Sequence, residues 1–129
     1  MQTHERGNLA QAVALSWLQN HGYALVQANY RRRIGEIDLV VLHPDRQTVV
    51  FVEVRYRSHQ RFGGAIESVD RRKQQKLVRT ADAWLQQHAS SMTPARIDVI
   101  ALCPASPRTP PEQLWQGHQL SWIVSAVEQ

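Results

Sequence analysis

Three acidic residues stand in otherwise apolar segments, and they are the first candidates for chemistry. Glu36 and Asp38 lie in GEIDLVVL, and Glu53 lies in TVVFVEVR, with Arg55 two residues later. Paired carboxylates are hard oxygen ligands that suit Mg²⁺ or Mn²⁺, and a neighbouring cation can stabilise charge on a phosphate. The chemistry to consider is therefore metal-dependent phosphoryl transfer.

The two segments that carry these acids are predicted to form a β-hairpin, because both are rich in Val, Leu, Ile and Phe and the turn HPDRQ separates them. If the strands pair antiparallel about this turn, His43 lies opposite Thr48, and the numbers of paired residues sum to 91. Asp38 then lies directly opposite Glu53. Like charges in that position repel each other, and a divalent cation between them would offset the repulsion.

Side chains alternate between the two faces of a strand, which places the acids on one face together with Arg55. In this register Arg55 lies opposite Glu36 and could neutralise it. Exposed acids on a solvent-facing sheet are the alternative, and a turn of odd length would separate Asp38 from Glu53. A helix is expected over the acid face, because that face also carries apolar residues: Val40, Leu42, Val49 and Phe51. The opposite face is wholly apolar, with Ile37, Leu39, Val41, Val50, Val52 and Val54.

The charge pattern favours a polyanionic partner. The chain has 15 Lys and Arg against 11 Asp and Glu, and 13 of the 15 cations are arginine, whose planar donors suit phosphate. Residues 55–79 hold eight of these cations and two acids. A solvated basic face without a partner is the alternative. The candidates for phosphate contacts are Arg31, Arg32, Arg33, Arg57, Arg61, Arg71, Arg72, Lys73 and Lys76.

The elements around the hairpin are predicted from hydrophobic periodicity, within one domain over residues 1–129. Helices are expected at 8–20 and 71–88, the second capped by Asp70. Strands are expected at 23–32, 35–43, 48–55 and 95–103, with a loop at 56–68, a second loop at about 103–113 and a tail at 114–127 that forms a strand or a short helix.

The composition also bounds the setting of the protein. There is no apolar run of membrane-spanning length and no signal-peptide pattern, and Cys103 is the one cysteine, so no internal disulfide is available. We expect a soluble cytoplasmic protein with no membrane partner.

Four segments, GEIDLV, VFVEVRYRS, KQQKLVRTA and RIDVIA, occur in this order over about residues 7–102. Their combination resembles the UPF0102 (YraN-like) family of small bacterial proteins, which is related to Holliday-junction resolvases within the PD-(D/E)XK restriction-endonuclease-like superfamily. The resemblance implies an α/β, single-domain, restriction-endonuclease-like fold with a central mixed β-sheet flanked by α-helices. It also implies a metal site built from Asp on one strand, Glu and Lys on the next, and Glu on the first helix.

Carried over by motif, the Asp is Asp38 and the strand Glu is Glu53, whereas the lysine position holds Arg55 and the helix position holds Gln11. Arginine stays protonated, so it can orient a group or stabilise charge but cannot accept a proton. Gln11 offers an amide oxygen without a negative charge. Gln74 corresponds to a polar position that supports the site in many superfamily members, or is simply a polar residue near a helix start.

The resemblance thus implies a metal-dependent DNA endonuclease, on branched DNA by analogy with resolvases, that uses Mg²⁺ or Mn²⁺ and acts as a homodimer. RNA stays open as a substrate. Two other functions are considered: a non-catalytic nucleic-acid-binding adaptor with a degenerate site, and a module whose basic face binds an acidic protein.

Overall fold

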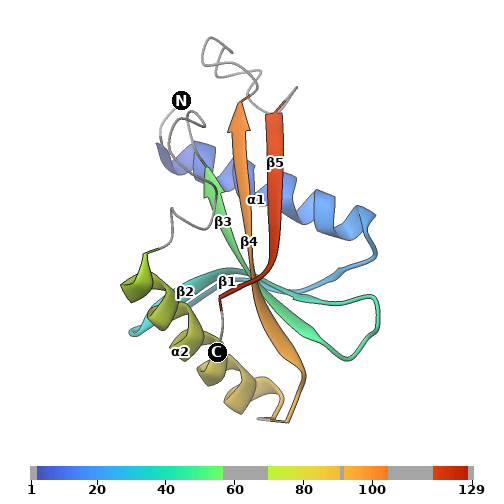
Figure 1. Ribbon diagram of the computed structural model, residues 1–129, viewed down its shortest axis with the longest axis vertical. Helices are drawn as coiled ribbons and strands as arrows, with labels where there is room; N and C mark the ends of the chain where they lie inside the picture. The colour runs from blue at the N-terminus through green and yellow to red at the C-terminus, as the bar shows by residue number, and fades with distance from the viewer. Residues whose placement is uncertain (1–2, 57–69, 91, 105–117, 128–129) are drawn as a thin grey trace.

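The computed structural model describes residues 3–56, 70–90, 92–104 and 118–127 (Figure 1). The loops expected at 56–68 and 103–113 lie almost entirely outside these ranges. The described elements are α1 (Thr3–Asn20), β1 (Ala24–Arg32), β2 (Gly35–Leu42), β3 (Val49–Tyr56), α2 (Arg71–His88), β4 (Ala95–Pro104) and β5 (His118–Val127). Helix α1 starts earlier than the predicted residue 8, and the tail forms a strand from His118.

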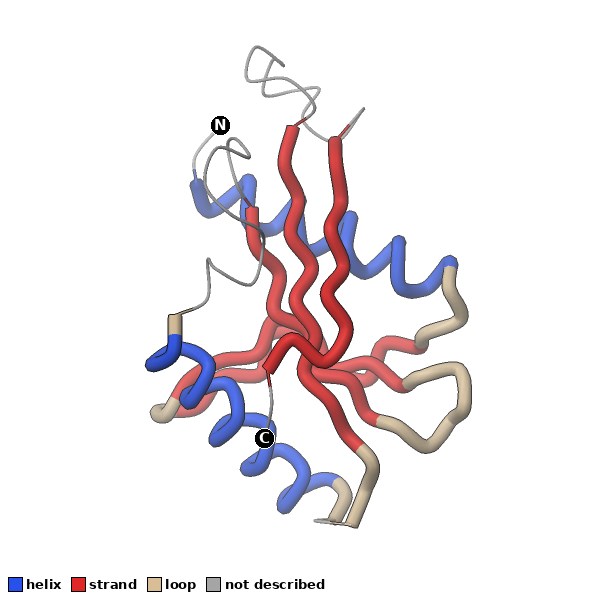
Figure 2. The backbone as a smooth tube through the Cα atoms, in the orientation of Figure 1, coloured by secondary structure: helices blue, strands red, loops and turns tan. Residues whose placement is uncertain are grey.

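The five strands form one twisted sheet in the order β1-β2-β3-β4-β5. All neighbours are antiparallel except β3 and β4, which are parallel, so the sheet is mixed. Helix α1 crosses one face of the sheet and α2 lies against the other, as Figure 2 shows. The predicted α/β fold, a central mixed sheet flanked by helices, is confirmed. Neither described helix combines the length and the apolar composition needed to cross a membrane.

Each helix is held by its apolar stripe. On α2, Leu77, Ala81 and Trp84 are buried and pack against Phe51 in the cluster between this helix and the sheet. The helix begins where expected, because the Asp70 carboxylate accepts a hydrogen bond from the third backbone N–H of the helix at 2.8 Å. On α1, Ala14 and Leu18 are fully buried against the opposite face, beside Leu39, Val41, Val50 and Val52.

The β2–β3 hairpin has the predicted register. Leu39 pairs with Val52 and Leu42 with Val49, so partner numbers sum to 91. The turn is held by Asp45, whose Oδ1 accepts hydrogen bonds from the backbone N–H groups of Gln47 and Thr48 at 2.8 and 2.9 Å. These bonds fix the even length of the turn, on which the facing positions of Asp38 and Glu53 depend.

The buried apolar side chains of the hairpin lie on the predicted faces, except for Ile37. Val40, Val49 and Phe51 lie on the α2 side. On the α1 side lie Val41, Val50 and Val52. Ile37 instead packs on the α2 side with Tyr30, its partner on β1. The side-chain alternation of β2 is therefore interrupted at Asp38, between Ile37 and Leu39.

Gly35, the first residue of β2, brings this strand close to α2. A Cβ atom built on Gly35 would lie 2.7 Å from Oγ1 of Thr80, which is fully buried and donates a hydrogen bond to the Lys76 carbonyl. Gly35→Ala should therefore lower the free energy of unfolding by about 1 to 3 kcal/mol, measured by urea titration. Arg33→Ala, at an exposed position in the turn that precedes β2, should change it by less than about 0.5 kcal/mol. If Gly35→Ala were as stable as wild type, β2 and α2 would not be in close contact at Gly35.

Candidate functional site

Strands β2 and β3 separate at the positions of Asp38 and Glu53. Strands β2 and β3 pair from Leu42 and Val49 as far as Leu39 and Val52. Beyond that point β2 continues to pair only with β1, and β3 with β4 as far as Tyr56. A gap therefore opens between two neighbouring strands of the sheet, and Asp38 and Glu53 are the next residues on its two sides.

Asp38 lies in this gap and is partly buried. Its Oδ2 accepts a hydrogen bond from the backbone N–H of Val54 at 2.7 Å. The carboxylate thereby satisfies an N–H group for which the diverging strand offers no carbonyl. This bond fixes the side chain between the strands, with one oxygen directed at β3.

Glu53 is 5% exposed and lies at the centre of a cluster of charges. Its carboxyl group interacts electrostatically with the carboxyl group of Asp38. Its Oε1 also lies 3.6 Å from Nη1 of Arg55 on the same strand and 3.4 Å from Nζ of Lys73 on α2. One buried carboxyl group thus interacts with a second acid and two cations.

Burial, followed by the nearby charge of Asp38, raises the pKa of Glu53 to about 7. Burial also raises the pKa of Asp38, and this effect prevails over the opposing hydrogen bond from Val54. Near neutral pH the pair therefore tends to retain a proton, and a bound cation would favour its full ionisation.

The raised pKa of Glu53 makes the stability of the protein depend on pH. Between about pH 4.5, the unfolded value, and pH 7 the folded state binds the proton more tightly than the unfolded state. The free energy of unfolding should therefore fall as pH rises through this window, by on the order of 1 to 3 kcal/mol. Urea titrations at pH 5 and pH 8 measure the difference.

Glu53→Gln should flatten this slope and be more stable than wild type at pH 8, because the buried side chain at position 53 then carries no charge. Asp82→Asn is the matched control, since Asp82 is an exposed acid on α2 away from the strand gap and its loss should leave the slope unchanged. Equal slopes for wild type and Glu53→Gln would contradict the assignment.

Two hollows flank the acid pair. One, of 480 Å³, lies between β2 and the first turns of α2, and the other, of 160 Å³, lies against α1. Glu36 lines both of them. The first is also lined by Gly35, Glu53, Asp70, Arg72, Lys73, Lys76 and Leu77. The second is also lined by Asn8, Gln11, Asn29, Arg31, Ile37, Asp38 and Val54.

The structure brings some of the predicted site residues together and not others. Gln11 shares the smaller hollow with Asp38, at the helix position implied by the family resemblance. Gln74 lines a different hollow, with Val78 of α2 and Val127 of β5. Its role in the site stays a prediction.

The expected pairing of Arg55 with Glu36 is wrong. Arg55 contacts Glu53, and Glu36 contacts Arg31, whose Nε lies 3.4 Å from the Glu36 carboxylate. The reason is the strand separation: β2 stays with β1 at this end, and Arg31 is the β1 residue directly opposite Glu36.

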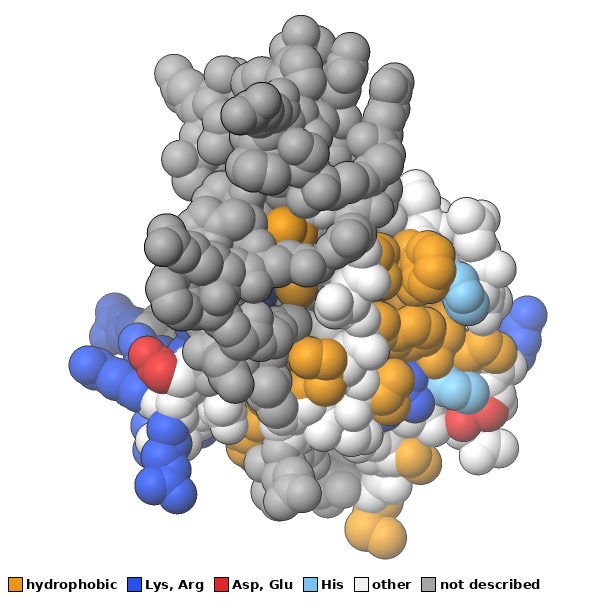
Figure 3. Space-filling view, turned by 45° about the horizontal axis from the view of Figure 1, so that its top comes forward, with side chains coloured by type: hydrophobic (Ala, Val, Ile, Leu, Met, Phe, Trp, Pro, Cys, Tyr) orange, Lys and Arg blue, Asp and Glu red, His pale blue; other side chains and the backbone are white. Residues whose placement is uncertain are grey.

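The basic residues gather around the first turns of α2. Figure 3 shows Lys and Arg side chains together at the left, the side that holds the start of α2 in Figure 1. Arg57 and Arg61 lie outside the described residues. Arg32 is directed at Tyr30 and Gln87, donating a hydrogen bond to the Tyr30 hydroxyl at 2.9 Å. The remaining candidates are Arg31, Arg33, Arg71 and Arg72, all exposed, with Lys73 and Lys76 in the larger hollow.

The donor set is sparse for a metal site. Within the described ranges, no group of three or more His, Cys, Asp or Glu side chains is arranged to hold an ion. Asp38 and Glu53 supply two carboxylates, and Gln11 is one of three residues with a neutral amide oxygen in the hollow that Asp38 lines, with Asn8 and Asn29. Mg²⁺ commonly binds through one or two carboxylates and keeps several waters, so this donor set fits that ion.

The sequence can now be placed among known proteins. Residues 10–102 match the model of the Uncharacterised protein family UPF0102. The chain belongs to the UPF0102 family. A UPF0102 protein of Stutzerimonas stutzeri is 45% identical over 128 residues, which cover 98% of each chain. Relatives from Pseudomonas syringae and Pseudomonas aeruginosa are 46% and 39% identical, over 96% and 98% of this chain and 94% of each relative. The resemblance to UPF0102 is confirmed, and the family name itself carries no activity.

One contact of the site does not follow from the sequence pattern. Lys73 is expected from the sequence as a general phosphate contact, whereas its Nζ lies 3.4 Å from Oε1 of Glu53. The spacing along the chain could not reveal this contact, because it depends on how α2 packs against the β2–β3 hairpin.

Proposed function

We propose that the protein binds nucleic acid and hydrolyses phosphodiester bonds in DNA, using Mg²⁺ or Mn²⁺ held by Asp38 and Glu53. The observation that carries this proposal is the buried carboxyl pair at the point where β2 and β3 separate, beside the basic start of α2. A surface pair of acids would have no such burial and no such neighbouring cations.

The larger hollow suits a phosphate group. Arg72, Lys73 and Lys76 line it together with Glu53. Cations from one helix can hold the phosphate backbone without reading the base sequence. Glu36, Glu53 and Asp70 also line this hollow and would repel a phosphate on their own, so substrate and cation are expected to bind together.

In the proposed reaction a water oxygen forms a bond to phosphorus while the bond from phosphorus to the leaving sugar oxygen breaks; the attacking water gives up a proton to bulk water, and the leaving oxygen takes one from bulk water. A divalent ion at Asp38 and Glu53 would activate the water and offset the charge that develops on the phosphate. The Asp38 carboxylate, held by Val54, has a second oxygen that can orient the water. Arg55 remains protonated, so it stabilises charge and does not take up a proton.

A non-catalytic nucleic-acid-binding adaptor is the second candidate. It is favoured by Arg55 and Gln11, which stand where the superfamily pattern has Lys and Glu, and by a donor set of only two carboxylates within the described residues. Such a protein would use the same basic surface and have no chemistry.

A cleavage and binding assay separates the two candidates. The protein is incubated with branched, nicked and single-stranded DNA and with structured RNA, in Mg²⁺ or Mn²⁺, with EDTA as control. We expect metal-dependent cleavage of at least one DNA, and an affinity that falls steeply between 50 and 200 mM salt (about tenfold or more). Salt-dependent binding without cleavage favours the adaptor. An absence of binding at low salt contradicts both and favours an acidic protein partner. On branched DNA we expect a homodimer, and we expect the protein in the cytoplasm.

A further inference from the structure

The chain has only two lysines, Lys73 and Lys76, and both line the hollow that contains Glu53. The other 13 cations are arginines. Lysine differs from arginine in presenting a compact point charge on a flexible stem, which can move between two nearby anions. The placement of both lysines on one hollow therefore distinguishes this hollow from the rest of the basic surface.

Lys73 approaches Glu53 from helix α2, whereas Arg55 lies on the same strand as Glu53, β3. Its Nζ lies 3.4 Å from Glu53 Oε1, and its side chain is 40% exposed, so the ammonium group reaches both the buried acid and the solvent. Its backbone is fixed, because its N–H donates to the Asp70 cap at 2.8 Å. Arg55, which follows Glu53 on β3, is less exposed, at 25%.

We propose that Lys73 is the lysine that acts on the substrate phosphate at this site. It is supplied by helix α2 and not by strand β3, where Arg55 stands. In the free protein its ammonium group pairs with Glu53. When a cation occupies the acid pair, that group turns to the phosphate in the hollow and holds it in line with the acids. Lys73 is thus a positioning residue, and this role rests on the proposed cleavage of phosphodiesters.

Three variants test the role in catalysis. Lys73→Met should lower kcat for DNA cleavage by about 100-fold or more, with a smaller change in KM, because it removes a charge placed on the reacting phosphate. Lys73→Arg should recover much of the lost rate. Lys76→Met removes the same charge from the same hollow one turn later, and should mainly raise KM and reduce the salt dependence of binding by about one charge. Equal losses of kcat in the two methionine variants would overturn the proposal.

The two lysines also allow a readout that needs no activity. Reductive ¹³C-methylation labels only Lys73, Lys76 and the amino terminus, and Lys76→Arg assigns the two lysine signals in an NMR spectrum. Glu53→Gln should shift the Lys73 signal clearly and the Lys76 signal less, and Mg²⁺ should shift the Lys73 signal in wild type but not in Glu53→Gln. A Lys73 signal unchanged by Glu53→Gln would overturn the proposal.

The two readouts separate this inference from the proposed function. If wild type cleaves none of the nucleic acids, the proposed hydrolysis fails, and the NMR comparison alone decides whether Lys73 pairs with Glu53. If wild type cleaves and Lys73→Met behaves like Lys76→Met, the proposed hydrolysis stands and the role of Lys73 fails.

Discussion

Asp38→Asn and Glu53→Gln are each expected to lower metal-dependent cleavage of DNA by roughly a thousandfold or more. Each variant keeps the size of the side chain and removes one of the two carboxylates that interact electrostatically at the strand gap. Initial rates on the best DNA substrate, at saturating Mn²⁺ and pH 8, measure the loss.

The two substitutions should not be additive, because the acids act as one unit: once either is lost, little remains for the second to remove. DNA binding at low salt should be kept, since the basic side chains are unchanged. Asp82→Asn, at an exposed position on α2, is the matched control and should cleave at nearly the wild-type rate. Cleavage that survives in both site variants would point to a contaminating nuclease and remove the basis for the proposed reaction.

Asp98→Ala is expected to lower the free energy of unfolding by about 3 to 5 kcal/mol, the largest effect on stability that we predict. Asp98 is fully buried. Its carboxylate accepts hydrogen bonds from Nε of Arg96 at 3.1 Å, from Nε1 of Trp122 at 3.0 Å and from the backbone N–H of Ser125 at 2.9 Å. Removing it leaves these donors without an acceptor.

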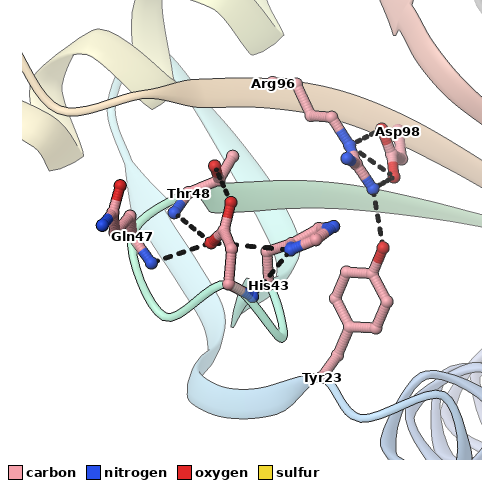
Figure 4. A network of polar contacts seen from close by, with 7 residues as sticks. Tyr23, His43, Gln47, Thr48, Arg96 and Asp98 are labelled. Atoms are coloured by element: carbon pink, nitrogen blue, oxygen red, sulfur yellow. Dashed lines mark hydrogen bonds and ion pairs between the residues drawn. The ribbon is translucent and has the colours of Figure 1, made fainter.

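The same carboxylate connects distant parts of the chain. Figure 4 shows Arg96 between Asp98 and the hydroxyl of Tyr23, to which it donates a hydrogen bond at 2.9 Å. The network thus joins β4, β5 and the segment after α1. Asp98 belongs to RIDVIA, one of the four segments that carry the family resemblance, and its role is structural.

Urea titration at pH 7 measures the loss, with Asp82→Asn as the exposed control, expected to change stability by less than about 0.5 kcal/mol. In a background of Arg96→Met, Asp98→Ala should cost less, because part of its effect is the unpaired guanidinium. A loss below about 1 kcal/mol in the wild-type background would show that the network contributes little.

The hairpin was predictable because its determinants are local. Asp45 holds a turn of even length, and the side chains of both strands alternate between two faces that carry apolar residues. These two features fix which residues lie opposite each other. This register makes Asp38 and Glu53 the next residues beyond the last pair, Leu39 and Val52, and the helix over this face follows from the apolar residues around Phe51.

The strand gap was not predictable from the same pattern. It depends on β2 remaining with β1 while β3 remains with β4, which are contacts between segments far apart in the sequence. For this reason the pairing of Arg55 with Glu36 was expected and does not occur. The contact of Lys73 with Glu53 was missed for a similar reason, since it requires α2 to lie beside the gap.

The central claim is that Asp38 and Glu53 together bind one divalent cation. A calorimetric titration with Mn²⁺ at pH 8, above the raised pKa of Glu53, tests it most directly. We predict one ion per chain for wild type and for Asp82→Asn, and no measurable binding for Asp38→Asn or Glu53→Gln. An absence of binding to wild type, or equal binding to all four proteins, would contradict the claim.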